Sequence, residues 1–168
     1  MPPPSLEIRD AVAADLPRIF AIYNREVEGG IATFETVAKD AERDMDWLTG
    51  RDEIHPVLVG VVDKHVVGWG SLGEWSPRGA YRRTAEVSVY VDVAARGGGY
   101  GAALLGALIE RARGIDDLHV LLARIALPNQ ASMAIHERLG FESFGTQRAC
   151  GEKLGRVLDV ELLDLHLD

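Results

Sequence analysis

A cluster of glycines between a strand-like and a helix-like segment is the part of the sequence best suited to bind an anion. The run Arg96-Gly97-Gly98-Gly99-Tyr100-Gly101-Ala102 follows a segment that alternates apolar and polar residues, and it leads into an apolar helical stripe. Glycines let the main chain approach a ligand closely, and the free N–H groups of a helix's first turn attract negative charge. Because Arg96 adds a cation, the pattern predicts a site for a compact polyphosphate.

Glu86 is the second candidate for chemistry, because it lies on the polar face of the preceding strand-like segment. Glu86, Ser88 and Tyr90 alternate with three valines, so we expect the valines to face a core and Glu86 to face a cleft. An ordinary glutamate, with a pKa of about 4.3, is a poor base for an ammonium. Glu86 can therefore act as a base only if burial raises its pKa or if a water relays the proton. The competing interpretation is a glutamate that faces solvent.

The same glycines formally satisfy the G-x-G-x-x-G/A fingerprint of dinucleotide-binding folds, at Gly97, Gly99 and Ala102. That fingerprint requires an acidic residue about 20 positions further on, at the end of the next strand. Here Asp116 and Asp117 precede the next strand-like run. Only one further helix-sized segment follows, so a nicotinamide or flavin site is disfavoured.

Composition narrows the class of protein. The chain has 168 residues, with 18 Lys and Arg against 26 Asp and Glu, and its formal net charge of -8 disfavours binding to nucleic acid. Its single cysteine, Cys150, cannot form an intrachain disulfide, and we expect it to be a half-buried small apolar residue. The first five residues resemble no targeting segment, and no run reaches the ~20 apolar residues that span a bilayer. We therefore expect a cytoplasmic protein that does not enter membranes.

The periodicity predicts a single domain, 1–168, with no internal boundary. Apolar spacing indicates a helix that begins after Asp15, as N-cap, and stops at Gly29-Gly30. Strands and helices alternate only in the second half, which favours a mixed sheet covered by helices. Trp47, Trp69 and Trp75 are expected to be core or interface aromatics. The other expected helices cover 38–48, the stretch from the glycine cluster to Gly114, and 130–139, and the expected strands cover 56–62, 66–72, 84–91, 120–126, 141–146 and 157–167.

Three motifs together resemble a known family. The run Arg96–Gly101 resembles the R/Q-x-x-G-x-G/A signature of the GNAT N-acetyltransferase superfamily, and Leu127–Ser132 and Ile135–Phe141 are similar to its N-x-x-S and His-x-x-x-G-F segments. The segments Glu86–Val91 and Gly151–Asp159 narrow the resemblance to phosphinothricin and methionine sulfoximine acetyltransferases. The resemblance covers about residues 6–167.

This resemblance implies a fold and a reaction. The fold is the GNAT acyl-CoA N-acyltransferase fold, an α/β (α+β mixed) domain whose central, mostly antiparallel twisted sheet is flanked by helices. The reaction is direct transfer of acetyl from acetyl-CoA to the α-amine of a small amino-acid-like compound, without a metal ion, in a homodimer. Glu86 would be the base and His136 the acid that protonates the leaving thiolate. A packed structural role for His136 remains the alternative.

The resemblance also implies binding residues. Main-chain groups of the strand would polarise the thioester carbonyl and bind pantetheine amides, and the glycine loop would bind phosphates. Asn129 and Ser132 would orient cofactor or water, although Ser132 is equally suited to cap a helix. An arginine before the strand would pair with a substrate carboxylate, with Arg78 and Arg82 as alternatives. The cofactor set is Val89, Tyr90, Val91, Arg96, Gly97, Gly98, Gly99, Tyr100, Gly101, Ala102, Asn129 and Ser132, and the substrate set is Phe34, Glu35, Arg78, Tyr81 and Arg82.

Two departures and two rival functions accompany this interpretation. The subfamily often carries a cation at the position of Gly98 and an aromatic residue at that of Val157, so a phosphate contact and a packing contact differ here. A protein or peptide N-acetyltransferase would need an open groove on both sides of the thioester. A non-catalytic acyl-CoA sensor would need no base, so Glu86 distinguishes it from an enzyme.

Overall fold

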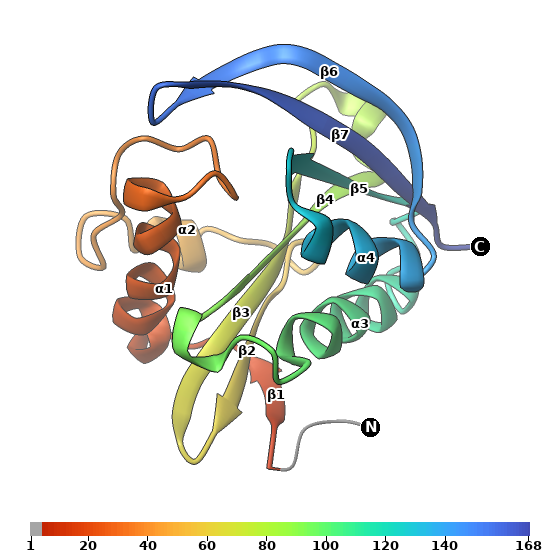
Figure 1. The fold of residues 1–168 in the computed structure, drawn as a ribbon. Coiled ribbons are helices and arrows are strands. Elements are labelled where there is room, and N and C mark those ends of the chain that lie inside the picture. Colours follow the sequence, from red (N-terminus) through yellow and green to blue (C-terminus); the bar gives the residue numbers. More distant parts are fainter. Residues whose placement is uncertain (1–4) are drawn as a thin grey trace.

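A computed structural model describes residues 5–168 and shows a seven-stranded sheet in the order β1-β2-β3-β4-β5-β7-β6 (Figure 1). Neighbouring strands in the described residues run antiparallel, except for the parallel pair β4 and β5. The predicted mixed, mostly antiparallel sheet is therefore confirmed. The strands are β1 (Glu7–Asp10), β2 (Val57–Val62), β3 (His65–Glu74), β4 (Thr84–Val91), β5 (Val120–Ala126), β6 (Glu142–Lys153) and β7 (Arg156–His166), and the helices are α1 (Leu16–Gly29), α2 (Asp46–Thr49), α3 (Tyr100–Arg113) and α4 (Gln130–Arg138).

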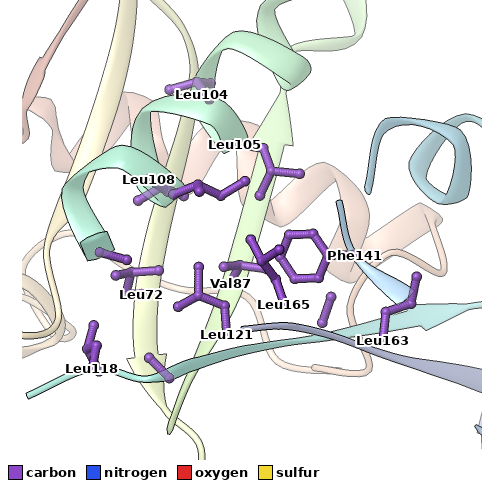
Figure 2. Close-up of a cluster of buried hydrophobic side chains, with 14 of the residues drawn as sticks. Leu72, Val87, Leu104, Leu105, Leu108, Leu118, Leu121, Phe141, Leu163 and Leu165 are labelled. Carbon is purple, nitrogen blue, oxygen red and sulfur yellow. The ribbon is translucent and has the colours of Figure 1, made fainter. Parts of the chain in front are cut away.

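Helices cover both faces of the sheet, so each face has its own core. In Figure 1, α1 and α2 lie on one side and α3 and α4 on the other. The α3 stripe of Leu104, Leu105 and Leu108 is fully buried, because apolar residues three and four apart share one helix face. Figure 2 shows these leucines above Leu72 and Val87 of the sheet. On the other face, α1 packs against β2 and β3 around Trp69 and Trp47, as expected of core aromatics.

Strands β4 and β5 separate after a short paired stretch. Their parallel register covers only Thr84↔Val120, Ala85↔Leu121 and Glu86↔Leu122, although β4 continues to Val91 and β5 to Ala126. On its other side, β4 stays paired with β3 from Ala85 to Val91. The sheet is therefore open on one side of β4 beyond Glu86, and this opening positions the site described below.

Most predicted elements are confirmed. The β2–β3 hairpin turns at Asp63-Lys64, both with positive φ, as two-residue hairpin turns require. Helix α1 begins at Leu16 with Asp15 at its N-cap position, as predicted, although the Asp15 side chain makes no capping hydrogen bond to this helix. The Asp15 carboxylate instead binds the Arg9 guanidinium and accepts the Val12 N–H, both at 2.8 Å.

The helix predicted over 38–48 is wrong for most of its length, since only α2 forms there. The Asp40 carboxylate accepts the N–H groups of Glu42 and Arg43, and Asp44 accepts the Asp40 N–H. Short acidic side chains that bind nearby backbone groups stabilise turns in place of helix. Most of the stretch predicted to be helical is therefore turn and irregular structure.

The edges of the sheet differ from expectation. Strand β1 was not predicted, and β6 extends to Lys153, well beyond residue 146. Cys150 lies on β6 and is exposed, so the prediction that its side chain is half-buried is wrong. The cytoplasmic location stays a prediction. No helix in residues 5–168 is long and apolar enough to cross a membrane. The segment in which no targeting signal is expected lies, apart from Ser5, outside the described residues.

The packing of α3 on the sheet predicts how much stability is lost when a buried side chain of this helix is shortened. Leu108 is 0% exposed and lies against Gly70 of β3. We expect Leu108→Ala to lower the free energy of unfolding by about 2–5 kcal/mol, because it removes buried methyl groups and leaves a cavity. Urea unfolding measures this loss. The control Val37→Ala, at a residue that is 66% exposed, is expected to change it by less than about 0.5 kcal/mol. Similar small losses in both variants would contradict the described packing.

Candidate active site

A cavity of about 350 Å³ lies between α1, α2 and the face of β3, β4 and β5 that these helices cover. This size falls at the lower end of small-molecule pockets, which measure about 300 to 1,000 Å³. The wall combines aromatic rings with charged groups of both signs. The aromatic residues are Phe20, Tyr23, Trp47, Trp69 and Tyr90, and the charged residues are Glu35, Lys39, Arg51, Glu74, Glu86 and Arg124.

Glu86 faces this cavity from β4, as the alternation of the strand predicts, together with Ser88 and Tyr90. Its side chain is 20% exposed, and one carboxylate oxygen lies 2.7 Å from Nη2 of Arg124. Burial raises the pKa of Glu86 above its ordinary value, and the Arg124 guanidinium opposes that rise. A partly buried carboxylate with a raised pKa in a cavity is well suited to accept a proton.

The glycine cluster forms a tight loop that ends at the N-terminus of α3. Gly97 and Gly99 have positive φ, +85° and +81°, which other residues rarely adopt. A side chain at Gly98 would collide with the ring of Tyr100, whose nearest atom lies 2.8 Å from the position of a Cβ. A larger residue at this position would require the Tyr100 ring to move. The first-turn N–H groups of α3 lack intrahelical acceptors and are available to an anion.

The main chain of β4 connects this loop with Glu86. The carbonyls of Ser88 and Tyr90 lie against Gly70 and Gly68 of β3. Since alternate residues of a strand direct their polar groups to opposite neighbours, Val89 and Val91 direct theirs toward the opening beside β5. Asp92 lies six positions after Glu86, or about 20 Å at ~3.4 Å per residue, so a ligand that reaches both ends must be long.

Comparison with known proteins identifies the family of this chain. The family model described as Acetyltransferase (GNAT) family matches residues 16–141, most of the chain. The chain belongs to the GNAT acetyltransferase family. This acetyltransferase is 43% identical over 166 residues to an L-methionine sulfoximine/L-methionine sulfone acetyltransferase of Pseudomonas aeruginosa, covering 98% of this chain and 96% of that protein.

Two solved structures extend the comparison. A ribosomal-protein-alanine N-acetyltransferase from Brucella melitensis is 43% identical, with a TM-score of 0.91 over 95% of the acetyltransferase and 99% of that chain. A phosphinothricin acetyltransferase from Sinorhizobium meliloti, solved in complex with AcCoA, is 34% identical, with a TM-score of 0.89 over 96% and 88% of the two chains. The family resemblance predicted from the motifs is confirmed.

Ten of the twelve predicted cofactor residues lie along β4, in the glycine loop and in the first turn of α3, and the other two, Asn129 and Ser132, lie at the start of α4. Tyr90 directs its main chain toward β3 and its side chain into the cavity, where its hydroxyl donates to the Ala32 carbonyl at 3.3 Å. Arg96 forms an ion pair with Glu26 of α1 at 2.7 Å. The glycine loop is thereby attached to the end of α1.

Asn129, not Ser132, caps α4, so the expectation that Ser132 caps this helix is wrong. The Asn129 side-chain oxygen accepts the N–H of Ser132 at 3.1 Å. His136 is buried against Phe141, with ring centroids 5.1 Å apart, and its Nδ1 donates to the Ser132 carbonyl at 2.8 Å. Burial lowers the pKa of His136. His136 does not line the cavity that holds Glu86, and its contacts match the packed role left open by the sequence.

The five predicted substrate residues are dispersed. Glu35 lines the cavity, and Phe34 packs beside Gly151 of β6. Arg78, Tyr81 and Arg82 are exposed and do not line the cavity, and Arg82 lies 3.4 Å from Asp117. Among residues 5–168, no group of three or more metal-binding side chains is close enough to hold a metal ion.

The loop that carries Phe34 and Glu35 is held from three directions. Asn24 exchanges two 2.8 Å hydrogen bonds with the main chain of Lys39. Tyr23 bonds the Thr33 hydroxyl at 2.9 Å. From the distant β6, the buried Lys153 ammonium donates to the carbonyls of Glu26 and Thr33, both at 2.7 Å. One wall of the cavity is therefore fixed before any ligand binds.

Sequence reasoning missed the cations of the cavity. Arg124 stands within the otherwise apolar run 120–126, and this interruption was the available signal. Arg51 and Lys39 carry no such signal, since they lie in a charged, irregular stretch. Arg51 donates to the carbonyls of Trp47, His55 and Leu72, which ties the α2 region to the end of β3.

The lowered pKa of His136 predicts a pH-dependent contribution to stability. Burial keeps the imidazole neutral in the folded enzyme, whereas the unfolded chain protonates it near its ordinary value of about 6.5. As pH falls from about 7.5 to about 5.5, the unfolded state binds the additional proton and the free energy of unfolding decreases.

We expect His136→Gln to lose less stability over that interval than the parent protein, measured by urea unfolding at both pH values. The control His65→Gln removes an exposed imidazole and is expected to follow the parent. Equal pH-dependent losses in the parent and in His136→Gln would contradict a neutral buried imidazole.

Proposed function

We propose that this acetyltransferase moves the acetyl group of acetyl-CoA to the α-amine of a small amino-acid-like compound of the methionine sulfoximine, methionine sulfone or phosphinothricin type, with Glu86 as the base. The observation that carries the proposal is the partly buried Glu86 in a small cavity, at the point where β4 and β5 separate. The relatives named for acetylation of such compounds support this substrate class.

The charges of the cavity suit a zwitterion. Acidic side chains can receive the ammonium of an amino acid, and cationic side chains can receive its carboxylate. Glu86 and Arg124 offer this combination within 2.7 Å of each other. The aromatic wall around Trp69 and Tyr90 suits an apolar or weakly polar side chain. A cavity of about 350 Å³ admits a single amino acid more readily than a folded protein surface.

The acetyl-CoA site fits the same arrangement. The N-terminus of α3 and the glycines at 97–101 offer main-chain N–H groups to phosphates. The polar groups of Val89 and Val91 face the opening beside β5, where an amide-containing arm can pair with them as a strand would. We place the phosphates at the loop and the thioester near Glu86.

The proposed reaction balances with these residues alone. Glu86 accepts a proton from the bound ammonium, directly or through water, and the amine nitrogen then attacks the thioester carbonyl carbon. A main-chain N–H of the Val89–Val91 segment stabilises the negative charge that develops on the carbonyl oxygen. A carbon–nitrogen bond forms and the carbon–sulfur bond breaks. The nitrogen of the adduct gives up its second proton, the thiolate takes up one proton to become the free thiol, and the proton held by Glu86 passes to solvent. We assign no part in the protonation of the thiolate to the packed His136.

A second substrate class is favoured by one comparison. The structure from Brucella melitensis, at 43% identity, is described as an enzyme for ribosomal-protein alanine. Such a substrate would present the N-terminal amine of a protein to Glu86, with no free carboxylate beside that amine. Acetylation of an alanine-initiated peptide, and not of amino acids, would establish this alternative.

We also propose that the enzyme is a homodimer. The edge strand β6 and its partner β7 expose Phe144 (54%) and Val157 (66%), and exposed apolar residues on a sheet edge favour association. Light scattering after size-exclusion chromatography is expected to give about twice the chain mass of 18.3 kDa. Phe144→Glu is expected to shift the mass toward one chain. A monomeric parent protein would refute the proposal.

The catalytic proposal is tested by Glu86→Gln with acetyl-CoA and a panel of amines. The panel contains methionine sulfoximine, methionine sulfone, phosphinothricin, common amino acids, polyamines and an alanine-initiated peptide. We expect turnover of the methionine-like compounds and a kcat at least ~100-fold lower in Glu86→Gln, because a positioned base contributes about that factor or more. Affinity for acetyl-CoA, followed by calorimetry, is expected to stay unchanged.

Two outcomes would contradict this assignment. Equal turnover by the parent and by Glu86→Gln would remove Glu86 from the mechanism. Binding of acetyl-CoA without turnover of any amine would favour the sensor function instead.

A further inference from the structure

Arg124 is the one cation that the described residues place in contact with Glu86. Its Nη2 lies 2.7 Å from Oε2 of Glu86, and its guanidinium carbon lies 5.2 Å from the ring centroid of Trp75. The side chain is 51% exposed, so it stands at the edge of the cavity. An aromatic face holds a guanidinium in a defined plane. Arg124 is therefore ordered beside the base and still accessible to a ligand.

The other cations of the cavity are placed differently. Arg51 uses its donors on three backbone carbonyls and stacks on Trp47 at 4.6 Å, which gives it a structural role. The main chain of Lys39 is hydrogen-bonded to the Asn24 side chain, and Lys39 takes no part in the contact between Glu86 and Arg124. Arg78 and Arg82 lie in the exposed segment before β4 and do not line the cavity.

The adjacency of Glu86 and Arg124 matches the spacing within an α-amino acid. One carbon atom separates the ammonium and the carboxylate of such a compound, so two groups that bind them must be neighbours. A guanidinium has five N–H donors, and it binds carboxylates through two parallel hydrogen bonds. The ion pair can thus open toward a zwitterion without leaving either charge unpaired, which would be costly in a buried site.

Resting on the proposed function, we propose that Arg124 is the receptor for the substrate carboxylate, so that binding exchanges the Glu86–Arg124 ion pair for two ion pairs with a zwitterionic α-amino acid. The acceptor must then carry a free carboxylate on the carbon next to its amine. Peptide N-termini, amino acid amides and polyamines lack that group and are poor acceptors. Arg124 is a residue of strand β5, outside the set predicted from the sequence.

The experiment compares one acceptor with and without its carboxylate charge. We would measure kcat/KM for L-methionine sulfone and for its carboxamide in the parent enzyme, Arg124→Ala and Arg124→Lys. The ratio between the two acceptors is the readout, because intrinsic differences in amine reactivity cancel when ratios are compared between variants. We expect the ratio to fall roughly 10- to 100-fold in Arg124→Ala, mainly through KM of the sulfone, and to fall less in Arg124→Lys.

Three other arginines serve as comparisons. Arg113 is an exposed arginine that pairs with Glu110 on α3, at a distance of 2.5 Å, and Arg113→Ala is expected to keep the parent ratio. Arg78→Ala and Arg82→Ala test the receptor positions implied by the sequence resemblance. Loss of discrimination in either of these two variants, with discrimination intact in Arg124→Ala, would overturn the proposal.

The pH profile gives a readout that a merely structural role would not change. Removing the Arg124 charge removes the group that opposes the raised pKa of Glu86, so the acidic limb of kcat/KM is expected to move to higher pH in Arg124→Ala. Arg124→Lys keeps a cation and is expected to move it less. The other titratable groups of the cavity, Tyr23, Glu35, Lys39, Arg51, Glu74 and Tyr90, are the same in all variants.

Failure of this inference differs from failure of the proposed function. If the parent enzyme acetylates the sulfone but Arg124→Ala keeps the parent ratio, the receptor is not Arg124, whatever the pH profile of that variant, whereas the reaction stands. If the parent enzyme acetylates neither compound, the proposed function itself fails, and this inference fails with it.

Discussion

The separation of β4 from β5 is the constraint on which the rest of the site depends. A parallel pair that ends at Glu86 and Leu122 leaves five further residues of β4 without a strand on that side. Unpaired backbone groups inside a fold must find other partners, because burying them unpaired is costly. The opening can therefore pair with an extended ligand. The Glu86 side chain, at the point where the two strands separate, lies where that ligand would end.

Both faces of the sheet contribute to this opening. The valines of β4 pack toward α3, so the helix that carries the proposed phosphate site is positioned by the same strand that carries the proposed base. On the opposite face, α1 and the turns that precede β2 form the aromatic and charged cavity. Glu86 and Gly99 are thus fixed relative to each other by ordinary core packing and not by flexible loops.

Much of this arrangement follows from short-range patterns in the sequence. The alternation along 84–91 correctly placed Glu86 on the cavity face, and the glycines at 97–101 correctly marked the start of α3. The stretch 38–48 could not be predicted in the same way, because the side-chain bonds of Asp40 and Asp44 favour turns over the weak helical stripe.

The cations of the cavity depend on long-range contacts. Arg124 meets Glu86 only because β4 and β5 are neighbours in the sheet, although 38 positions separate the two residues. Lys153 reaches Thr33 across 120 positions. No local pattern in the sequence reports such contacts, and family resemblance pointed instead to Arg78 and Arg82, which the structure places at the surface.

The last turn of α1 serves as a common anchor for two separate parts of the protein. The Glu26 carboxylate holds Arg96 of the glycine loop, while the Glu26 carbonyl accepts a hydrogen bond from Lys153 of the C-terminal hairpin. The glycine loop and the wall of the cavity are therefore attached to the same residue. A substitution at Lys153 in the C-terminal hairpin would remove a hydrogen bond from the residue that also holds Arg96, so its effects need not be confined to the cavity.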